Sequence, residues 1–224
     1  MTATEQIETL LKDRYSCRGF LSRPVPESDI RKIVTVAQRT ASWCNSQPWQ
    51  VHILSGEAAV RFREGLIRFR QENGPKSDIP FPREYKGVYL ERRRECGFQL
   101  YESVGIARGD REGSARQADE NFRLFGAPHV AVITTPEALG VYGALDCGAY
   151  VSNFMLVAQS MGVASIAQAA LAGQSKFLRQ FLSLPEDRLV LCGISFGYAD
   201  EKHPANSFRT SRADLGQAVE FIND

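Results

Sequence analysis

The chain has 224 residues with 27 basic and 26 acidic side chains, and its formal net charge of +1 argues against a nucleic-acid-binding protein. Its five cysteines form no Cys-x-x-Cys pair, and the three histidines lie at no ligand spacing to them, so we expect reduced thiols and no metal site. A chain of this length can bury a full core without disulfides, and we expect one cytoplasmic domain, residues 1–224, with no targeting peptide.

Hydrophobic periodicity divides the chain into helices with short strands between them. The expected helices are residues 5–12, 26–39, 58–71, 89–106, 113–125, 150–161 and 176–182, and the expected strands are residues 51–54, 129–135, 163–168 and 188–198. Residues 129–135 are apolar on both faces, which is typical of a central strand. Because the strands show no tight βαβ repetition, we predict an α+β layered domain. No Gly-x-Gly-x-x-Gly follows a strand, which disfavours a Rossmann fold.

Three segments depart from the average composition. Residues 73–82 are rich in Gly, Pro and Asp and predict a loop, which opens a charged helical excursion over about residues 73–125. No charged residue occurs between Asp146 and Lys176, a length that could span a bilayer. Several polar side chains interrupt that stretch, so we predict a fully buried helix followed by a buried strand, and no membrane partner. A C-terminal arm from about residue 203 ends in apolar residues with little local material to cover them, which suggests a second subunit.

Residues 14–18 (Arg-Tyr-Ser-Cys-Arg) place two guanidiniums and a hydroxyl on one short segment after the first helix. In an extended segment alternate residues point the same way, so Arg14, Ser16 and Arg18 converge while Tyr15 and Cys17 face the body of the protein. Guanidinium geometry matches phosphate oxygens two at a time, so this segment suits a phosphate. The alternative for the segment taken alone is a solvated surface.

Residues 45–49 (Asn-Ser-Gln-Pro-Trp) add two carboxamides, Asn45 and Gln47, in a turn that Pro48 stiffens. A carboxamide both donates and accepts hydrogen bonds, which reading the edge of a heterocycle requires. Taken alone, this run also fits an ordinary turn.

Together the two runs resemble the opening of the FMN-dependent nitroreductase family, which typically has Arg-Arg-Ser-x-Arg, a helix, and then Pro-Ser-x-x-Asn-x-Gln-Pro-Trp. The resemblance extends over nearly the whole chain, through residues 162–165, 193–198 and 209–215, and residues 121–128 make it closest to the nitrobenzoate-reductase-like branch. It implies a three-layer α/β/α fold with a central, mostly antiparallel sheet and a C-terminal arm exchanged between the subunits of a homodimer.

The resemblance also implies FMN as the cofactor, NADH or NADPH as the reductant and a small aromatic acceptor such as a nitroaromatic or a quinone. Hydride passes to N5 of the flavin, and two electrons then pass to the acceptor in the same pocket, so no catalytic side chain is expected. Trp43 is expected beside the acceptor. The residues that the resemblance places around FMN are Arg14, Tyr15, Ser16, Arg18, Ser42, Asn45, Gln47, Ala167, Gln168, Ala169, Arg209 and Arg212.

Two alternatives remain open from the sequence. The same scaffold could serve enone reduction, dehalogenation or flavin breakdown. From a different class, the chain could be a flavin-binding or flavin-storing protein without turnover.

Overall fold

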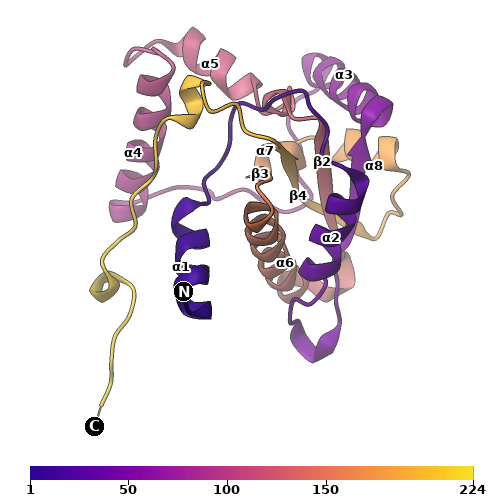
Figure 1. Ribbon diagram of the computed structural model, residues 1–224. Helices are drawn as coiled ribbons and strands as arrows, with labels where there is room; N and C mark the ends of the chain where they lie inside the picture. The colour runs from indigo at the N-terminus through magenta and orange to yellow at the C-terminus, as the bar shows by residue number, and fades with distance from the viewer. Residues whose placement is uncertain (224) are drawn as a thin grey trace.

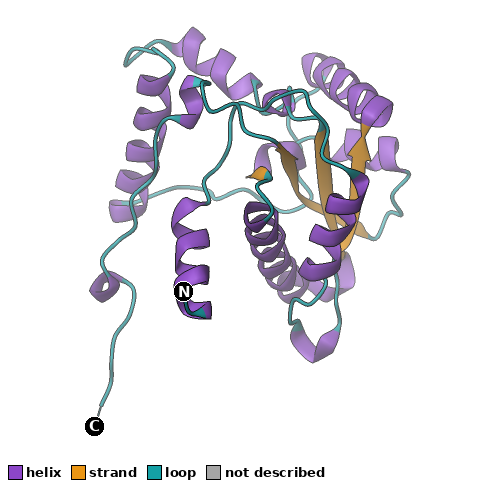
Figure 2. Cartoon of the chain, in the orientation of Figure 1, coloured by secondary structure: helices purple, strands orange, loops and turns teal. Residues whose placement is uncertain are grey.

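A four-stranded antiparallel sheet lies at the centre of the computed structural model, which describes residues 1–223 (Figure 1, Figure 2). The spatial order is β1-β2-β4-β3, so β2 and β4 are the inner strands, as expected for the strand at residues 129–135. All four strands that the sequence predicted are present. Their bounds are β1 (Gln50–Ser55), β2 (His129–Pro136), β3 (Ala164–Gln168) and β4 (Arg188–Gly197).

Helices cover both faces of the sheet, because side chains of β2 alternate between two apolar cores. Val130 and Val132 pack with α3 (Gly56–Glu72) and α8 (Ser175–Leu182) on one face. Ala131 and Ile133 pack with α2 (Glu27–Ala37) and α6 (Gly140–Ser160) on the other face. The result is the predicted three-layer α/β/α arrangement around an antiparallel sheet.

The remaining elements lie at the periphery. Helix α1 (Ala3–Asp13) has no buried residue and contacts α6. Helices α4 (Gly87–Ser103) and α5 (Arg111–Asp119) form the helical excursion on one side of the sheet, and the C-terminal segment passes close to α4 (Figure 1). The helix predicted over residues 113–125 ends earlier than expected, at Asp119; turns follow it, and Leu124 and Phe125 adopt positive φ angles that are incompatible with a continuing α-helix.

Helix α6 corrects two predictions. It begins at Gly140, ten residues before the predicted residue 150, and it is not fully buried. One face packs on the sheet through residues such as Cys147 and Phe154, whereas Val141 and Leu145 on another face are 83% and 66% exposed. The segment Glu137–Ser160 is long and apolar enough to cross a membrane by length and composition, but 28% of its most apolar window is buried in the fold. Within the charge-free stretch itself, Gly148, Ala149, Ser152 and Asn153 are also exposed, so the lack of charge did not mark a fully buried helix.

Candidate cofactor site

The first motif runs in an extended conformation beside the edge strand β3. Ser16 forms a parallel bridge with Ser165, and the Cys17 N–H donates to the Ser165 carbonyl at 3.1 Å. This pairing fixes the alternation that the sequence predicted, with Cys17 fully buried and Arg14 and Ser16 facing a cavity.

Tyr15 differs from the expectation that it faces only the body of the protein. It packs against the core yet also lines the cavity, and the Arg209 guanidinium lies 3.7 Å from its ring centroid. A tyrosine can contribute this stacking surface where a second arginine could not.

The cavity has a volume of about 960 Å³ and lies between α1, the first motif, α6 and the C-terminal segment. Its apolar wall comes from Ile7 and Leu11 of α1 and from Met155 of α6. Its polar residues include Arg14, Tyr15, Ser16, Arg18, Ser152, Arg209, Thr210 and Arg212. All six residues predicted from the first motif and the tail are therefore brought together, although these segments are almost 200 positions apart.

Asn206 joins the tail to the first motif, and no motif in the sequence predicted this role. Its Oδ1 accepts from the Arg18 N–H at 2.7 Å, while its Nδ2 donates to the carbonyls of Gly19 and Asp200, both at 2.9 Å. Because Asn206 is buried and fully hydrogen-bonded, it holds the start of the C-terminal segment against the first motif.

Within the described part of the chain, the four arginines of this cavity form no ion pair with an acidic side chain. Among residues 1–223, none of the ion pairs involves Arg14, Arg18, Arg209 or Arg212. Their guanidiniums donate only to nearby carbonyl and hydroxyl oxygens, such as the Ser16 carbonyl.

The electrostatics of the cavity favour an anion. Burial, and then the charge of Arg212, lowers the pKa of Arg14, and burial lowers the pKa of Arg18. Partly desolvated positive charges that repel one another are stabilised by a negative ligand. Among the described residues that line the cavity, Glu8 is the one acid, and it is already paired with Lys12 at 2.8 Å. These residues therefore fit a phosphate group.

The second motif folds into a turn whose polar groups form hydrogen bonds with one another. The Gln47 N–H donates to Ser42 Oγ at 2.9 Å, and the Gln47 side-chain amide donates to Asn45 Oδ1 at 3.0 Å. Cys44, Asn45 and Gln47 all have positive φ angles, a conformation that costs free energy in non-glycine residues. Such strain often accompanies ligand sites, and the carboxamides are exposed.

Within one chain the second motif does not reach the arginine cavity. The backbone N–H of Trp43 donates to Asp146 Oδ2 at 3.0 Å, and the centroid of the Trp43 ring lies 4.6 Å from that of the Tyr142 ring. Each residue turns a helix by about 100°. Tyr142 and Asp146 therefore lie on one flank of α6, and Met155, which lines the cavity, lies on the opposite flank.

The third predicted group, Ala167 to Ala169, lies at the other end of β3 from the first motif. Ala169 is four residues beyond Ser165, which at about 3.3 Å per residue is roughly 13 Å along the strand. Ala167 and Ala169 are exposed, but the Gln168 side chain points into the core and donates to the Asn121 carbonyl at 2.9 Å. Only the backbone of Gln168 is thus available to a ligand.

Within residues 1–223 no group of three or more His, Cys, Asp or Glu side chains is placed to hold a metal ion. The described site therefore consists of an arginine-lined cavity, a strand edge leading away from it and a carboxamide turn on the far side of α6. The arginine-lined cavity provides an anion site, and the exposed edge of β3 leads away from it. Such an arrangement suits a ligand that carries a phosphate at one end and a flat ring at the other.

Comparison with known proteins gives the class of protein that this fold and site define. The sequence model described as "Nitroreductase family" matches residues 11–198. The chain therefore belongs to the nitroreductase family.

Individual relatives match over nearly the full length. Nitroreductase NfnB of Mycolicibacterium smegmatis is 37% identical over 216 residues, covering 96% of this chain and 92% of that protein. A 4-nitrobenzoate reductase of Pseudomonas putida is 32% identical over 213 residues, covering 93% and 92%. The crystal structure of the FMN-dependent nitroreductase NfnB from Mycobacterium smegmatis in complex with NADPH has a TM-score of 0.94 and 35% identity, covering 99% of this chain and 100% of that chain.

Proposed function

We propose that this protein is an FMN-dependent oxidoreductase that carries electrons from NAD(P)H to a flat, electron-poor aromatic acceptor, with nitroaromatics and quinones as the acceptor classes. The observation that carries the proposal is the cavity lined by four arginines, which form no ion pair with any carboxylate among residues 1–223. The family assignment, and relatives named as nitroreductases of FMN and NADPH dependence, support the same reaction.

The chain's own residues bind and orient the cofactor. Arg14 and Arg18 bind the phosphate, and Arg212, with Arg209 beside it, reaches the same phosphate from the tail. The hydroxyl of Ser16 faces the cavity between the two arginines and donates to the phosphate or the ribityl chain. Forked guanidiniums are suited to this role because each can make two parallel hydrogen bonds.

The edge of β3 orients the ring. Ala167 and Ala169 leave room for a flat ring beside their backbone, and a backbone N–H of this segment would donate to the ring edge. When bound, FMN supplies the chemistry, accepting a hydride from NAD(P)H and passing two electrons to the acceptor. The protein then contributes binding, orientation and exclusion of water.

We further propose a homodimer in which each flavin site draws on both chains. The carboxamides of Asn45 and Gln47 lie on the flank of α6 opposite the arginine cavity, so they complete a site only across a subunit boundary. Val141 and Leu145 of α6 are exposed and apolar, as are Phe221 and Ile222 at the end of the tail. Obligate dimers bury surfaces of this kind, and a two-fold axis gives two equivalent sites. A soluble, cytoplasmic location is consistent with the free cysteines.

Flavin identity and reduction test the proposed function. The purified protein should release FMN, not FAD, on denaturation, because it has one phosphate-binding cluster. In a stopped-flow instrument, NADH or NADPH should bleach the bound flavin, and a nitroaromatic or quinone should restore its colour. Stoichiometric FAD would contradict the cofactor assignment, and FMN that neither nucleotide reduces would make the chain a flavin-binding protein without turnover.

A further inference from the structure

A second pocket lies where β3 ends, beside Ala169. Its volume is about 310 Å³. Cys147, Gly148 and Val151 of α6 form one wall, the start of β4 forms the floor, and residues 79–82 form the outer wall. Val151 adjoins Ser152, which lines the arginine cavity, so the two pockets follow one another along α6.

The lining of this pocket is apolar. The described residues that line it carry no charge, and its two thiols, Cys147 and Cys192, are neutral because burial raises their pKa values to about 11 and about 12. An apolar cavity of about 150 Å³ is enough to hold benzene. A space of 310 Å³ therefore accommodates a substituted benzene ring.

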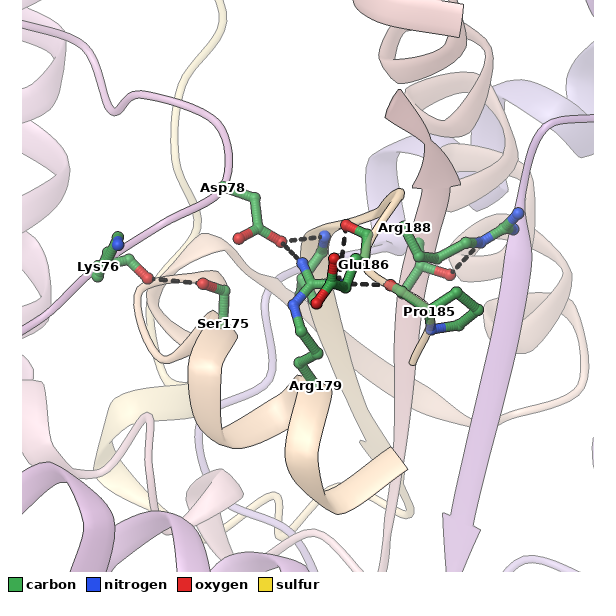
Figure 3. Close-up of polar contacts among 9 residues, drawn as sticks. Lys76, Asp78, Ser175, Arg179, Pro185, Glu186 and Arg188 are labelled. Atoms are coloured by element: carbon green, nitrogen blue, oxygen red, sulfur yellow. Dashed lines mark hydrogen bonds and ion pairs between the residues drawn. The ribbon is translucent and has the colours of Figure 1, made fainter. Parts of the chain in front are cut away.

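The outer wall, residues 79–82, is the C-terminal part of a segment that we call the strap, residues 76–82. The N-terminal part of the strap is hydrogen-bonded to the start of α8 and to the start of β4 (Figure 3). The Lys76 N–H donates to the Gly173 carbonyl at 2.7 Å, and Ser175 Oγ donates to the Lys76 carbonyl at 2.9 Å. Asp78 makes the second attachment: its Oδ2 accepts from Arg179 Nη2 at 3.0 Å and from the Val190 N–H at 2.8 Å.

The Asp78–Arg179 pair is well shielded, with side-chain exposures of 15% and 25%. Arg179 also donates to the Pro185 carbonyl at 2.6 Å, which fixes the guanidinium (Figure 3). A partly buried, multiply hydrogen-bonded pair holds its geometry better than an exposed one. The strap is therefore a fixed wall, and Phe81 lies within 3.7 Å of the position that a Cβ at Gly173 would occupy.

We propose that this pocket receives the aromatic ring of the electron acceptor, that Phe81 determines which acceptors fit, and that Asp78 is a positioning residue acting through the strap. This inference rests on the proposed function and assigns the acceptor subsite within it. The pocket borders Ala169, so an acceptor ring there lies next to the segment that holds the flavin edge.

The pocket suits an acceptor better than the flavin ring itself. The polar edge of the isoalloxazine needs hydrogen-bond partners, and carboxamides such as Asn45 and Gln47 offer them. The thiols and aliphatic side chains of this pocket do not offer such hydrogen-bond partners. A nitrobenzene ring, in contrast, needs only apolar surface and an aromatic edge such as that of Phe81.

The test uses the FMN-loaded enzyme with Phe81→Ala, Phe81→Tyr and Asp78→Asn, and Phe98→Ala as control. Phe98 is an exposed aromatic residue on α4 that stacks with Arg108 outside both pockets. Acceptors are nitrobenzene and the bulkier 4-nitrobiphenyl. Binding of the neutral, non-reducible probe chlorobenzene is followed separately by the absorbance change of oxidised flavin.

Phe81→Ala should weaken chlorobenzene binding and raise the KM for nitrobenzene by about three- to tenfold, which is the range for losing one aromatic contact. It should also narrow the preference for nitrobenzene over 4-nitrobiphenyl, while Phe81→Tyr and Phe98→Ala keep the wild-type preference. Asp78→Asn should shift the preference in the same direction as Phe81→Ala. Flavin content should stay unchanged in every variant, and the control Phe98→Ala should also keep the wild-type rate of flavin bleaching by NADPH.

Two results would overturn the inference. Unchanged probe binding and acceptor preference in Phe81→Ala would show that the pocket does not receive the acceptor. Loss of FMN from Phe81→Ala would show that the flavin ring occupies it. Failure of the proposed function is separate, since it would appear in the wild-type enzyme as absent FMN or absent NAD(P)H oxidation.

Discussion

Replacing Arg18 by alanine should change the FMN-bound and FMN-free protein in different ways. In the bound protein Arg18 supplies charge-assisted hydrogen bonds to the phosphate, and losing them costs about 2–4 kcal/mol. Since about 1.4 kcal/mol corresponds to tenfold in affinity, the Kd for FMN should rise by roughly 30-fold to 1000-fold. In the free protein the variant removes a partly desolvated charge without an acidic partner, so stability should be unchanged or slightly higher.

Titration of the apoprotein with FMN, followed by quenching of flavin fluorescence, measures the affinity. Thermal unfolding with and without FMN measures the two stabilities. Arg31→Ala is the matched control, because Arg31 is an exposed arginine paired with Glu27 on α2, far from the cavity, and such pairs contribute little. An unchanged Kd in Arg18→Ala, or a free protein that loses stability as much as the FMN-bound one, would refute the anion-site reasoning.

Three further predictions concern stability and assembly. Burial lowers the pKa of His129 below its ordinary 6.5, so the unfolded chain binds this proton more readily than the folded one, and thermal stability should fall as pH drops below about 6.5. His129→Gln should reduce the dependence of the melting temperature on pH in this range, and an unchanged dependence would exclude His129 as its source. Asn206→Ala should lower the free energy of unfolding by about 1–3 kcal/mol and weaken FMN binding, because it leaves buried groups unpaired; a variant with wild-type FMN affinity would show that the tail is held in other ways. Deleting the residues after His203 should yield flavin-free, poorly soluble protein, whereas a flavin-bound active monomer by light scattering would contradict the dimer.

The strands and the first motif could be predicted because their signals are local. Residues 130–133 are apolar at four successive positions and so on both faces, which is typical of an inner strand with two covered faces. The alternation of Arg14, Ser16 and Arg18 held because the segment pairs with β3, and pairing enforces the two-residue period.

The rest of the site could not be read from the sequence, because it depends on how separate elements pack. The early start of α6 was hidden because Gly140, Gly143 and Gly148 weaken the helical signal. Gln168 resembles a pocket residue in a run of alanines, but one step of strand register turns its side chain into the core. Nothing in the spacing of Asp78 and Arg179, 101 residues apart, indicated that they meet.

The arginine cavity and the carboxamide turn lie on opposite flanks of α6, and this placement has a consequence for genetics. If each site combines the first motif of one chain with the second motif of its partner, a chain defective in Arg18 and a chain defective in Asn45 can complement each other. Each mixed dimer would contain one wholly intact site and one site with both defects. Random reassociation of equal amounts should therefore restore about a quarter of the sites, although each parent alone has none intact. Two alleles that are each inactive would then give an active enzyme when expressed together.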